Sequence, residues 1–479
     1  MWSMRRDKIQ TRFITRCIVV TFCSVSVLSN VFAATFTVTK TSDTFPNGKP
    51  GELRWAIQQS NKTAGAHVIN FNIPGTGPFE IKPVEPLDLI RKKVTIDGYS
   101  QPCALANSLA QGSNARLLIV LSGSNYTVGS GFANFANGLT FVPGSEGSVV
   151  KGLVFNEWLT DGIFINSADN ITVVGNFIGT NADGTAEKAN QAGIFIEFCK
   201  NTVIGTADPA DRNVIAGSFL FFNASAGIVT HGTKGVSIKN NYVGLDKTGT
   251  VALGNSLAGI TCFGSTDTVI GGATPAERNV VSGHVVVGVS LEGSSNSVVQ
   301  GNYIGTDVSG TSALGNSNIG LFISGHGLPK SATNNAIQKN LISGNRIGIK
   351  LGDAIVPGAN GNRIKGNLIG TDASGSVGLS NQYGIVVNDN TNEIGGITNK
   401  ARNVVSGNTK SGILVYGGAH STIIRGNYIG LASDGVSPLP NGFGIQLGLS
   451  GAKGAAGKNS IHDNAFGGGN TTSSLCVVG

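Results

Sequence analysis

The chain has 479 residues, more than most single hydrophobic cores hold, so several domains or a repeat array are expected. Its 70 glycines follow no strict every-third spacing, which excludes a collagen helix, and its 40% hydrophobic against 13% charged residues exclude a disordered chain. More than half of the formal charge of +7 lies before residue 34, and no run of Lys and Arg follows. We therefore expect no nucleic-acid partner.

Residues 1–33 have the pattern of a secretion signal peptide. Five basic residues between Arg5 and Arg16 precede an apolar stretch from Cys17 to Leu28, and Val31-Phe32-Ala33 offers a small-residue cleavage site. The stretch is shorter than the roughly 20 residues that cross a bilayer. The pattern predicts bacterial export to the extracellular space or cell surface, with no membrane attachment after cleavage.

Residues 34–137 predict an N-terminal cap and the first irregular coils of a repeat array. Strands are expected at 35–40, 67–73 and 93–98, where apolar and polar residues alternate. Between them, residues 51–61 predict a short amphipathic helix with Leu53, Ala56 and Ile57 on one face. Such a helix would cover the strand edges that an open array exposes.

Residues 138–479 repeat two alternating motifs. GNFIGT at 175–180 returns at 240–245, 301–306, 366–371 and 426–431, and NTVIGTADPADRNVIAG from 201 returns from 267 and 392. Each unit opens with a Gly-apolar-x-apolar signature, from Gly138 to Gly444, and holds three short segments of period-2 alternation. Without its insertions, a unit is about 22 residues long, the size of one turn of a parallel β-helix. The pattern predicts an all-β solenoid of about 11 coils that share one core.

The corners of the coils have their own signals. The Gly-Asn pair before the third strand suits a left-handed corner, and stacked Asn side chains can form an amide ladder, so we interpret these residues as structural. Insertions fall after the third strand and before Arg-Asn, where loops could border an outer groove. Cys103, Cys199, Cys262 and Cys476 follow the signal. Their spacing along the array predicts few or no disulfides.

At this point the sequence resembles bacterial secreted proteins of the right-handed parallel β-helix repeat group, which look like pectin lyases in fold. The matching segments are TFTVTKTSDTFPNGKPGELRWAIQQSN at the start, INFNIPG at 69–75, VTIDG at 94–98 and the RNVVSGN and GNYIGTD repeats. The resemblance covers nearly everything after residue 34. It implies a right-handed coil, and it is specific for fold but not for activity.

Register arithmetic gives one candidate catalytic cluster. His326, Asp353 and Asp389 follow Gly320, Gly348 and Gly384 at nearly the same offset, so they would lie on consecutive coils about 5 Å apart. Paired carboxylates at such a separation suit glycosidic-bond chemistry. The alternative is that these Asp residues form turns. Gly325-His326-Gly327 and Arg363-Ile364-Lys365 match polygalacturonase strings, but the chain has no Asp-Asp pair.

The candidate binding residues point outward from the coils. Lys350 would project beside the two aspartates, and Phe164, Phe195 and Phe322 could offer rings to a sugar or stack on each other. Arg212, Arg278 and Arg402 could pair with acidic glycans or could bond the inserted loops.

No metal site and no cofactor are expected. The Asp residues of the GTD turns resemble a calcium-loop fragment but lack its acidic ladder, so calcium has no support beyond that fragment.

Two functions stay open. The first is a secreted protein that binds polysaccharide or cell-surface glycan. The second is a lyase or glycoside hydrolase that acts on acidic polysaccharide. A compact acidic or mixed-charge cluster on one face would favour the enzyme, and the sequence leaves both the substrate and the oligomeric state open.

Overall fold

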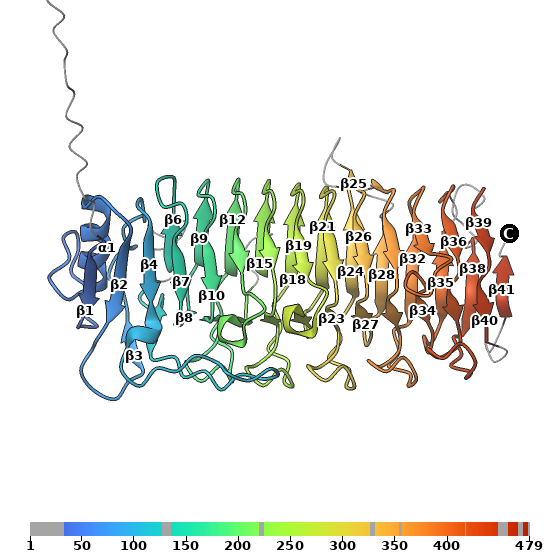
Figure 1. The fold of residues 1–479 in the computed structure, drawn as a ribbon, viewed down its shortest axis with the longest axis horizontal. Helices are drawn as coiled ribbons and strands as arrows, with labels where there is room; N and C mark the ends of the chain where they lie inside the picture. Colours follow the sequence, from blue (N-terminus) through green and yellow to red (C-terminus); the bar gives the residue numbers. More distant parts are fainter. Residues whose placement is uncertain are drawn as a thin grey trace, which may run out of the picture.

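In the computed structural model the chain is a long solenoid of stacked coils (Figure 1). The structure describes residues 33–126, 136–219, 225–325, 331–353, 357–416, 418–448 and 458–467, and the backbone of 473–477. The predicted signal peptide, apart from Ala33, lies outside the described residues. No helix in the described ranges is long and apolar enough to span a membrane.

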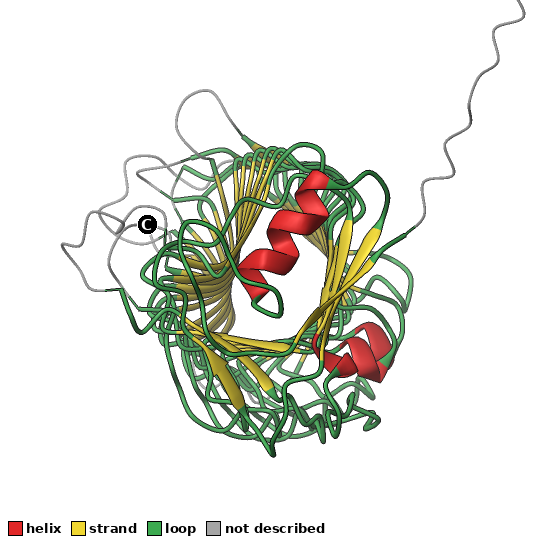
Figure 2. Cartoon of the chain, turned by 90° about the vertical axis from the view of Figure 1, so that its left-hand side faces the viewer, coloured by secondary structure: helices red, strands yellow, loops and turns green. Residues whose placement is uncertain are grey.

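Three parallel sheets run the length of the solenoid, and each regular coil gives one strand to each (Figure 2). This is the parallel β-helix that the repeats predict, with the right-handed coil that the resemblance implies, and parallel crossover connections favour that hand.

The first sheet holds the strands that begin near the Gly-apolar signature. In spatial order these are β6 (Leu139–Phe141), β9 (Asp161–Asn166), β12 (Ala192–Glu197), β15 (Ala226–His231), β18 (Ala258–Phe263), β21 (Val287–Glu292), β24 (Ile319–Ser324), β28 (Ile347–Leu351), β32 (Tyr383–Val387), β35 (Ser411–Val415), β38 (Phe443–Leu447) and β41 (Ser473–Val477).

The second sheet also takes in the irregular strands of the N-terminal region. It comprises β1 (Thr35–Val38), β2 (His67–Phe71), β4 (Val94–Asp97), β7 (Val149–Lys151), β10 (Thr172–Val174), β13 (Val203–Ile204), β16 (Ser237–Ile238), β19 (Val269–Gly271), β22 (Val298–Gln300), β26 (Ala336–Gln338), β30 (Arg363–Lys365), β33 (Glu393–Gly395), β36 (Ile423–Arg425) and β39 (Ser460–His462).

The third sheet follows the Asn corner. It comprises β3 (Phe79–Ile81), β5 (Ile119–Ser122), β8 (Leu153–Asn156), β11 (Phe177–Ile178), β14 (Val214–Ile215), β17 (Tyr242–Val243), β20 (Val280–Val281), β23 (Tyr303–Ile304), β27 (Leu341–Ile342), β31 (Leu368–Ile369), β34 (Val404–Val405), β37 (Tyr428–Ile429) and β40 (Ala465–Phe466). A separate pair, β25 (Ala332–Thr333) and β29 (Ala359–Asn360), lies at an inserted corner.

The core is made of aliphatic side chains stacked in register. Ile163, Ile194 and Ile228 are partners on β9, β12 and β15, and each is fully buried. Because side chains alternate along a strand, the residues between them face outward. This places Phe164 and Phe195 on the outer face of the first sheet, as the alternation predicts.

The predicted amide ladder is present at the corner between the second and third sheets. Each side-chain oxygen accepts from its predecessor in the ladder, from the side-chain amide of Asn213 in the case of Asn241 and from the backbone N–H in the others. The order is Asn176, Asn213, Asn241, Asn279, Asn302, Asn340, Asn367, Asn403, Asn427 and Asn464. In the Gly-Asn pairs the left-handed residue is the Gly, such as Gly175 with φ 64°, and not the Asn that the corner was expected to use.

A second ladder, which the repeats did not suggest, occupies the corner before the first sheet. Asn316, Asn345, Asn381, Asn408 and Asn441 bond in sequence there. His284 takes the place of an Asn in this row. The His284 Nδ1 accepts from the backbone N–H of Asn255 at 3.1 Å, and the backbone N–H of His284 donates to Asn316 Oδ1.

The helix α1 (Leu53–Lys62) lies across the N-terminal end of the solenoid (Figure 2). Leu53, Ala56 and Ile57 are buried against the first coil, as predicted. Arg54 is also buried, and its guanidinium forms a two-pronged ion pair with Asp43, with both N–O distances 2.8 Å. The cap is therefore fixed by a buried charge pair as well as by apolar contacts.

The long connection after the short 3₁₀ helix η1 (Gly98–Ser100) runs along the outside of the third sheet (Figure 1). Its residues 107–114, which we call the strap, contact coils far ahead in the sequence. Asn107 Nδ2 donates to the Pro209 carbonyl, and the Gly112 N–H donates to the Tyr242 hydroxyl at 2.7 Å.

The insertions form two rows of outer loops. One row contains the 3₁₀ turns η2 (Pro209–Asp211) and η3 (Pro275–Glu277), and the other contains the Asp turns. Asp307 Oδ1 accepts from the N–H groups of Thr311 and Ser312, both at 3.1 Å. This bonding gives the Asp a turn-forming role, which is the interpretation preferred over a calcium loop. Cys103, Cys199 and Cys262 are free, and the side chain of Cys476 lies outside the described residues.

Candidate functional site

A groove of about 260 Å³ lies on the outer face of the first sheet, across β24, β28, β32 and β35. We call it the Lys350 groove. Its lining residues are Asn318, Ile319, Arg346, Ile347, Lys350, Tyr383, Val386, Asn388, Leu414 and Tyr416. Three strand spacings make it about 14 Å long, enough for a short stretch of extended polymer.

Strand register brings these side chains together. Ile319, Ile347 and Tyr383 are partners at one outward position, and Lys350, Val386 and Leu414 are partners at the next. Because outward residues do not fill the core, the repeat constrains them little. Basic and aromatic residues can therefore occupy these outward positions without disturbing the coil.

Three basic side chains lie in or beside the groove. Arg346 and Lys350 line it, and Lys410 Nζ lies 5.2 Å from the centre of the Tyr383 ring. Arg346 Nη1 donates to Asn318 Oδ1 at 3.2 Å. Lys350 Nζ lies 5.4 Å from the Phe322 ring centre and forms an ion pair with Asp353. No Asp or Glu is among the described lining residues, and Asp353 beside them offsets the charge of Lys350, so the groove presents a net positive charge and hydrogen-bond donors.

Tyr416 closes one end of the groove. Burial raises the pKa of its hydroxyl, the nearby Tyr383 adds to this, and Arg346 opposes it. The phenol is therefore neutral at physiological pH and can donate or accept a hydrogen bond. With Tyr383 it gives the groove two half-buried rings, each with an apolar body and a polar tip.

Two of the three residues of the predicted catalytic cluster lie among the described residues. His326 lies outside the described residues. Asp353 and Asp389 occupy equivalent positions on adjacent coils, but Asp353 pairs with Lys350. Asp389 is 6% exposed, and its Oδ2 accepts from the N–H groups of Gly358 and Ala359, both at 2.8 Å. Asp389 thus holds the inserted corner at β29 of the preceding coil, through bonds to residues 31 and 30 positions earlier and not through the local turn bonds of the alternative.

Only one of the two polygalacturonase-like strings lies wholly among the described residues. Arg363-Ile364-Lys365 forms β30 in the second sheet, with Ile364 in the core and Lys365 paired to Glu393 at 2.7 Å. Gly325 follows β24 of the first sheet, and His326 and Gly327 lie outside the described residues.

The predicted phenylalanines pack against protein. Phe164 and Phe195 meet edge to face at 5.7 Å between ring centres. Phe195 and Phe322 also pack beside a buried apolar cluster on the outer face of the first sheet. This favours the stacking alternative for Phe164 and Phe195, whereas Phe322 lies beside Lys350 at the edge of the groove.

The three predicted arginines lie over the third sheet. Each stacks on a tyrosine of the next coil, with Arg–ring distances of 4.7 Å for Arg212 on Tyr242, 3.8 Å for Arg278 on Tyr303 and 4.2 Å for Arg402 on Tyr428. Arg212 bonds the strap, which the sequence did not predict. Neither Asp211 nor Glu277 pairs with these arginines, because Asp211 accepts from Thr206 and Glu277 from Lys239.

Arg346, Tyr383 and Tyr416 were not among the predicted site residues. Tyr383 directly precedes Gly384, and Tyr416 directly follows the strand that contains Gly412. Marking every outward position of the Gly-led strands would have found both. Among the described residues, no group of three or more His, Cys, Asp or Glu is placed to hold a metal ion.

No family model and no curated sequence matches the chain, but several solved structures are similar to it. The A-module of mannuronan C-5 epimerase AlgE4 from Azotobacter vinelandii is 14% identical, with 89% of this chain and 93% of that chain covered and a TM-score of 0.44. The catalytic domain of a GH87 alpha-1,3-glucanase is 12% identical over 93% and 68%, with a TM-score of 0.42. The Dettilon tailspike protein is 14% identical over 89% and 66%, with a TM-score of 0.42.

At these identities the likeness concerns the fold alone and does not assign a ligand or reaction. The three parallel sheets and the Asn ladder define the class of this chain: a right-handed parallel β-helix with pectin lyase-like architecture. What the chain binds must be argued from its own outer surface.

Proposed function

We propose that this protein binds acidic polysaccharide in the Lys350 groove. The observation that carries the proposal is the grouping of Arg346 and Lys350 in the groove with Lys410 beside Tyr383. No carboxylate is among the described lining residues, and Asp353 lies beside them, paired with Lys350. Uronate carboxylates form charge-assisted hydrogen bonds with such cations, and tyrosine rings can cover the apolar face of a sugar. Export, as the first 33 residues predict, would bring the protein to polymers of this kind at a cell surface.

Binding accounts for the groove better than hydrolysis does. Glycoside hydrolases of the usual kind place two carboxylates on either side of the scissile bond. Here Asp353 is engaged by Lys350, and Asp389 by two backbone N–H groups. A lyase or hydrolase acting on acidic polysaccharide is the competing function. A substitution of Asp353 distinguishes the two functions, because it should strengthen binding in one case and abolish product release in the other.

The test is affinity electrophoresis of the purified chain in gels that contain polygalacturonate, alginate or a neutral glucan. We expect retardation by the acidic polymers only. Lys350→Met should weaken binding about tenfold, which corresponds to the loss of roughly 1.4 kcal/mol. Asp353→Asn should strengthen binding, because the substitution releases the charge of Lys350. Lys92→Gln, an exposed lysine far from the groove, is the control for net charge.

An enzyme would behave differently in the same experiment. Release of reducing ends or of unsaturated products that disappears in Asp353→Asn would make Asp353 a catalytic acid and would replace the binding proposal. Equal retardation of the wild type and Lys350→Met would show that the Lys350 groove does not bind the polysaccharide.

A further inference from the structure

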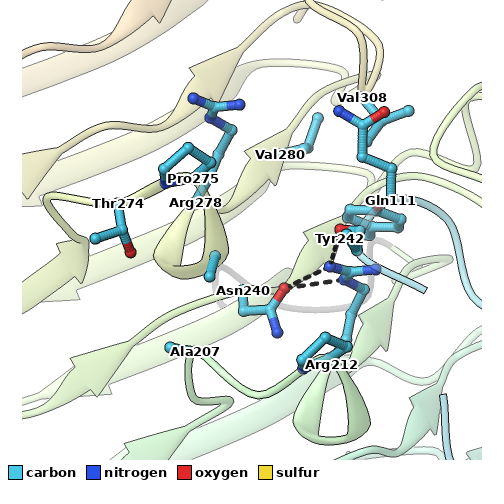
Figure 3. Close-up of a pocket in the computed structure, with 13 residues that line it drawn as sticks. Gln111, Ala207, Arg212, Asn240, Tyr242, Thr274, Pro275, Arg278, Val280 and Val308 are labelled. Carbon is cyan, nitrogen blue, oxygen red and sulfur yellow. Dashed lines mark hydrogen bonds between the residues drawn. The ribbon is translucent and has the colours of Figure 1, made fainter. Parts of the chain in front are cut away.

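A second and larger cavity, of about 620 Å³, lies over the third sheet, on a different face from the Lys350 groove. Tyr242 and Val280 form part of its floor, Thr274, Pro275 and Arg278 form one side, and Arg212 lies at the other end (Figure 3). The strap residues Ala110 and Gln111 also line it. We call it the Arg278 cavity. Its volume is typical of a ligand site.

The strap shows what one end of this cavity binds. Arg212 is 5% exposed, and its Nη atoms donate to three main-chain carbonyls of the strap, those of Leu109, Ala110 and Gly112. Its Nε donates to Asn240 Oδ1, which fixes the guanidinium (Figure 3). The Tyr242 hydroxyl accepts the Gly112 N–H. The strap is the tip of a turned loop whose ends are joined by the antiparallel Leu105–Arg116 bridge, and Arg212 binds this tip through its main-chain carbonyls.

The repeat places the same pair of residues two coils further on. Val214 pairs with Tyr242, and Val280 with Tyr303, so Arg278 and Tyr303 correspond to Arg212 and Tyr242 at a distance of about 10 Å. Arg278 is held in the same way, because its Nε donates to the Gly301 carbonyl and its guanidinium stacks on Tyr303. Its two Nη atoms, however, donate to none of the described residues.

The surroundings leave those donors available. Two arginines and no acid are among the described lining residues, and Glu277 is held by Lys239 Nζ at 2.8 Å. Pro209, Pro275, Val280 and Val308 give apolar walls. Such walls suit a chain with small side chains, whereas the many hydroxyls of a sugar would find few partners.

We propose that the Arg278 cavity binds a turned peptide loop of a partner protein, one with small uncharged side chains at its tip. The loop lies beside the strap, its main-chain carbonyls accept from Arg278 as those of the strap accept from Arg212, and one of its N–H groups donates to the Tyr303 hydroxyl. Recognition of this kind uses the backbone for affinity and the apolar walls for selection of side-chain size. The site is separate from the Lys350 groove, so either proposal can fail without the other.

Fluorescence anisotropy of a labelled peptide with the sequence of residues 105–116, LANSLAQGSNAR, tests this on the full chain, with a scrambled peptide as the reference. The native sequence should bind more tightly than the scrambled one. Arg278→Gln should weaken binding about tenfold or more. Lys339→Gln removes the same charge from an exposed residue two coils further along the row, and it should leave the affinity within about twofold.

Val308→Trp fills the cavity without a change in charge and should also abolish binding. Circular dichroism verifies that each variant is folded. Equal binding of the two peptides, an equal effect of Lys339→Gln, or full binding by both Arg278→Gln and Val308→Trp would overturn the proposal. An oligogalacturonate that binds in place of the peptide, and is lost in Arg278→Gln, would also overturn it by making the cavity a glycan site.

Discussion

Single residues at the corners show where the repeat tolerates a change and where it does not. His284 replaces an Asn in the second ladder and keeps the acceptor role through Nδ1. Burial lowers the pKa of its imidazole to about 3, although the nearby Val243 carbonyl raises it somewhat. His284 is therefore neutral in the folded chain, whereas an unfolded chain protonates it near its ordinary pKa of about 6.5.

This difference predicts a pH-dependent stability. Because the folded pKa is depressed, the stability linked to His284 is complete above about pH 6.5 and is lost as the pH falls toward about 3. At about pH 4.5 the loss should reach about 3 kcal/mol. His284→Asn should abolish this part of the dependence. Urea unfolding of both proteins at neutral and acidic pH measures it, and parallel pH profiles would contradict the assignment.

At the scale of elements, the Asn ladder is the feature most specific to the fold. Asn302 donates to the carbonyls of Ile270 and Gln300 and to Asn340 Oδ1, and it accepts from the Asn279 N–H. Removing the side chain leaves buried donors and acceptors of two coils without partners.

Asn302→Ala should therefore lower the free energy of unfolding by about 3 kcal/mol. Asn72→Ala, at an exposed position, is the matched control and should change it by less than about 0.5 kcal/mol. Urea unfolding measures both. Similar small effects at the two positions would show that the ladder contributes little to the free energy of unfolding.

The cap helix gives a second prediction for an element. Arg54 is 1% exposed and pairs with an equally buried Asp43, so Arg54→Ala leaves an unpaired buried carboxylate. The expected loss is about 3 to 5 kcal/mol. Lys188→Ala breaks an exposed pair with Glu157 and should cost less than about 1 kcal/mol. Thermal unfolding compares them, and equal shifts in Tm would contradict a structural role for the buried pair.

The whole molecule shows what a sequence of this kind can and cannot predict. Period-2 alternation, the Gly-led units and the cap helix were predictable because each reflects a local rule that recurs at every coil. The strap's bonds to Arg212 and the grouping of cations at the Lys350 groove were not predictable, because they depend on which outward residues of separate coils become neighbours. His284 was missed for the opposite reason, since one copy of a repeat departs from its consensus and only the ladder shows its role.

For the whole molecule, the central question is whether the Lys350 groove binds acidic glycans. The measurement that tests it is a calorimetric titration of the full chain with a uronate oligosaccharide at low and high salt, beside the Arg346→Gln/Lys350→Met double variant. Ion pairs with the exposed groove predict binding by the wild type that weakens as salt screens the charges, and little or no binding by the double variant. Binding of equal strength by both proteins, or none by the wild type at low salt, would contradict the account.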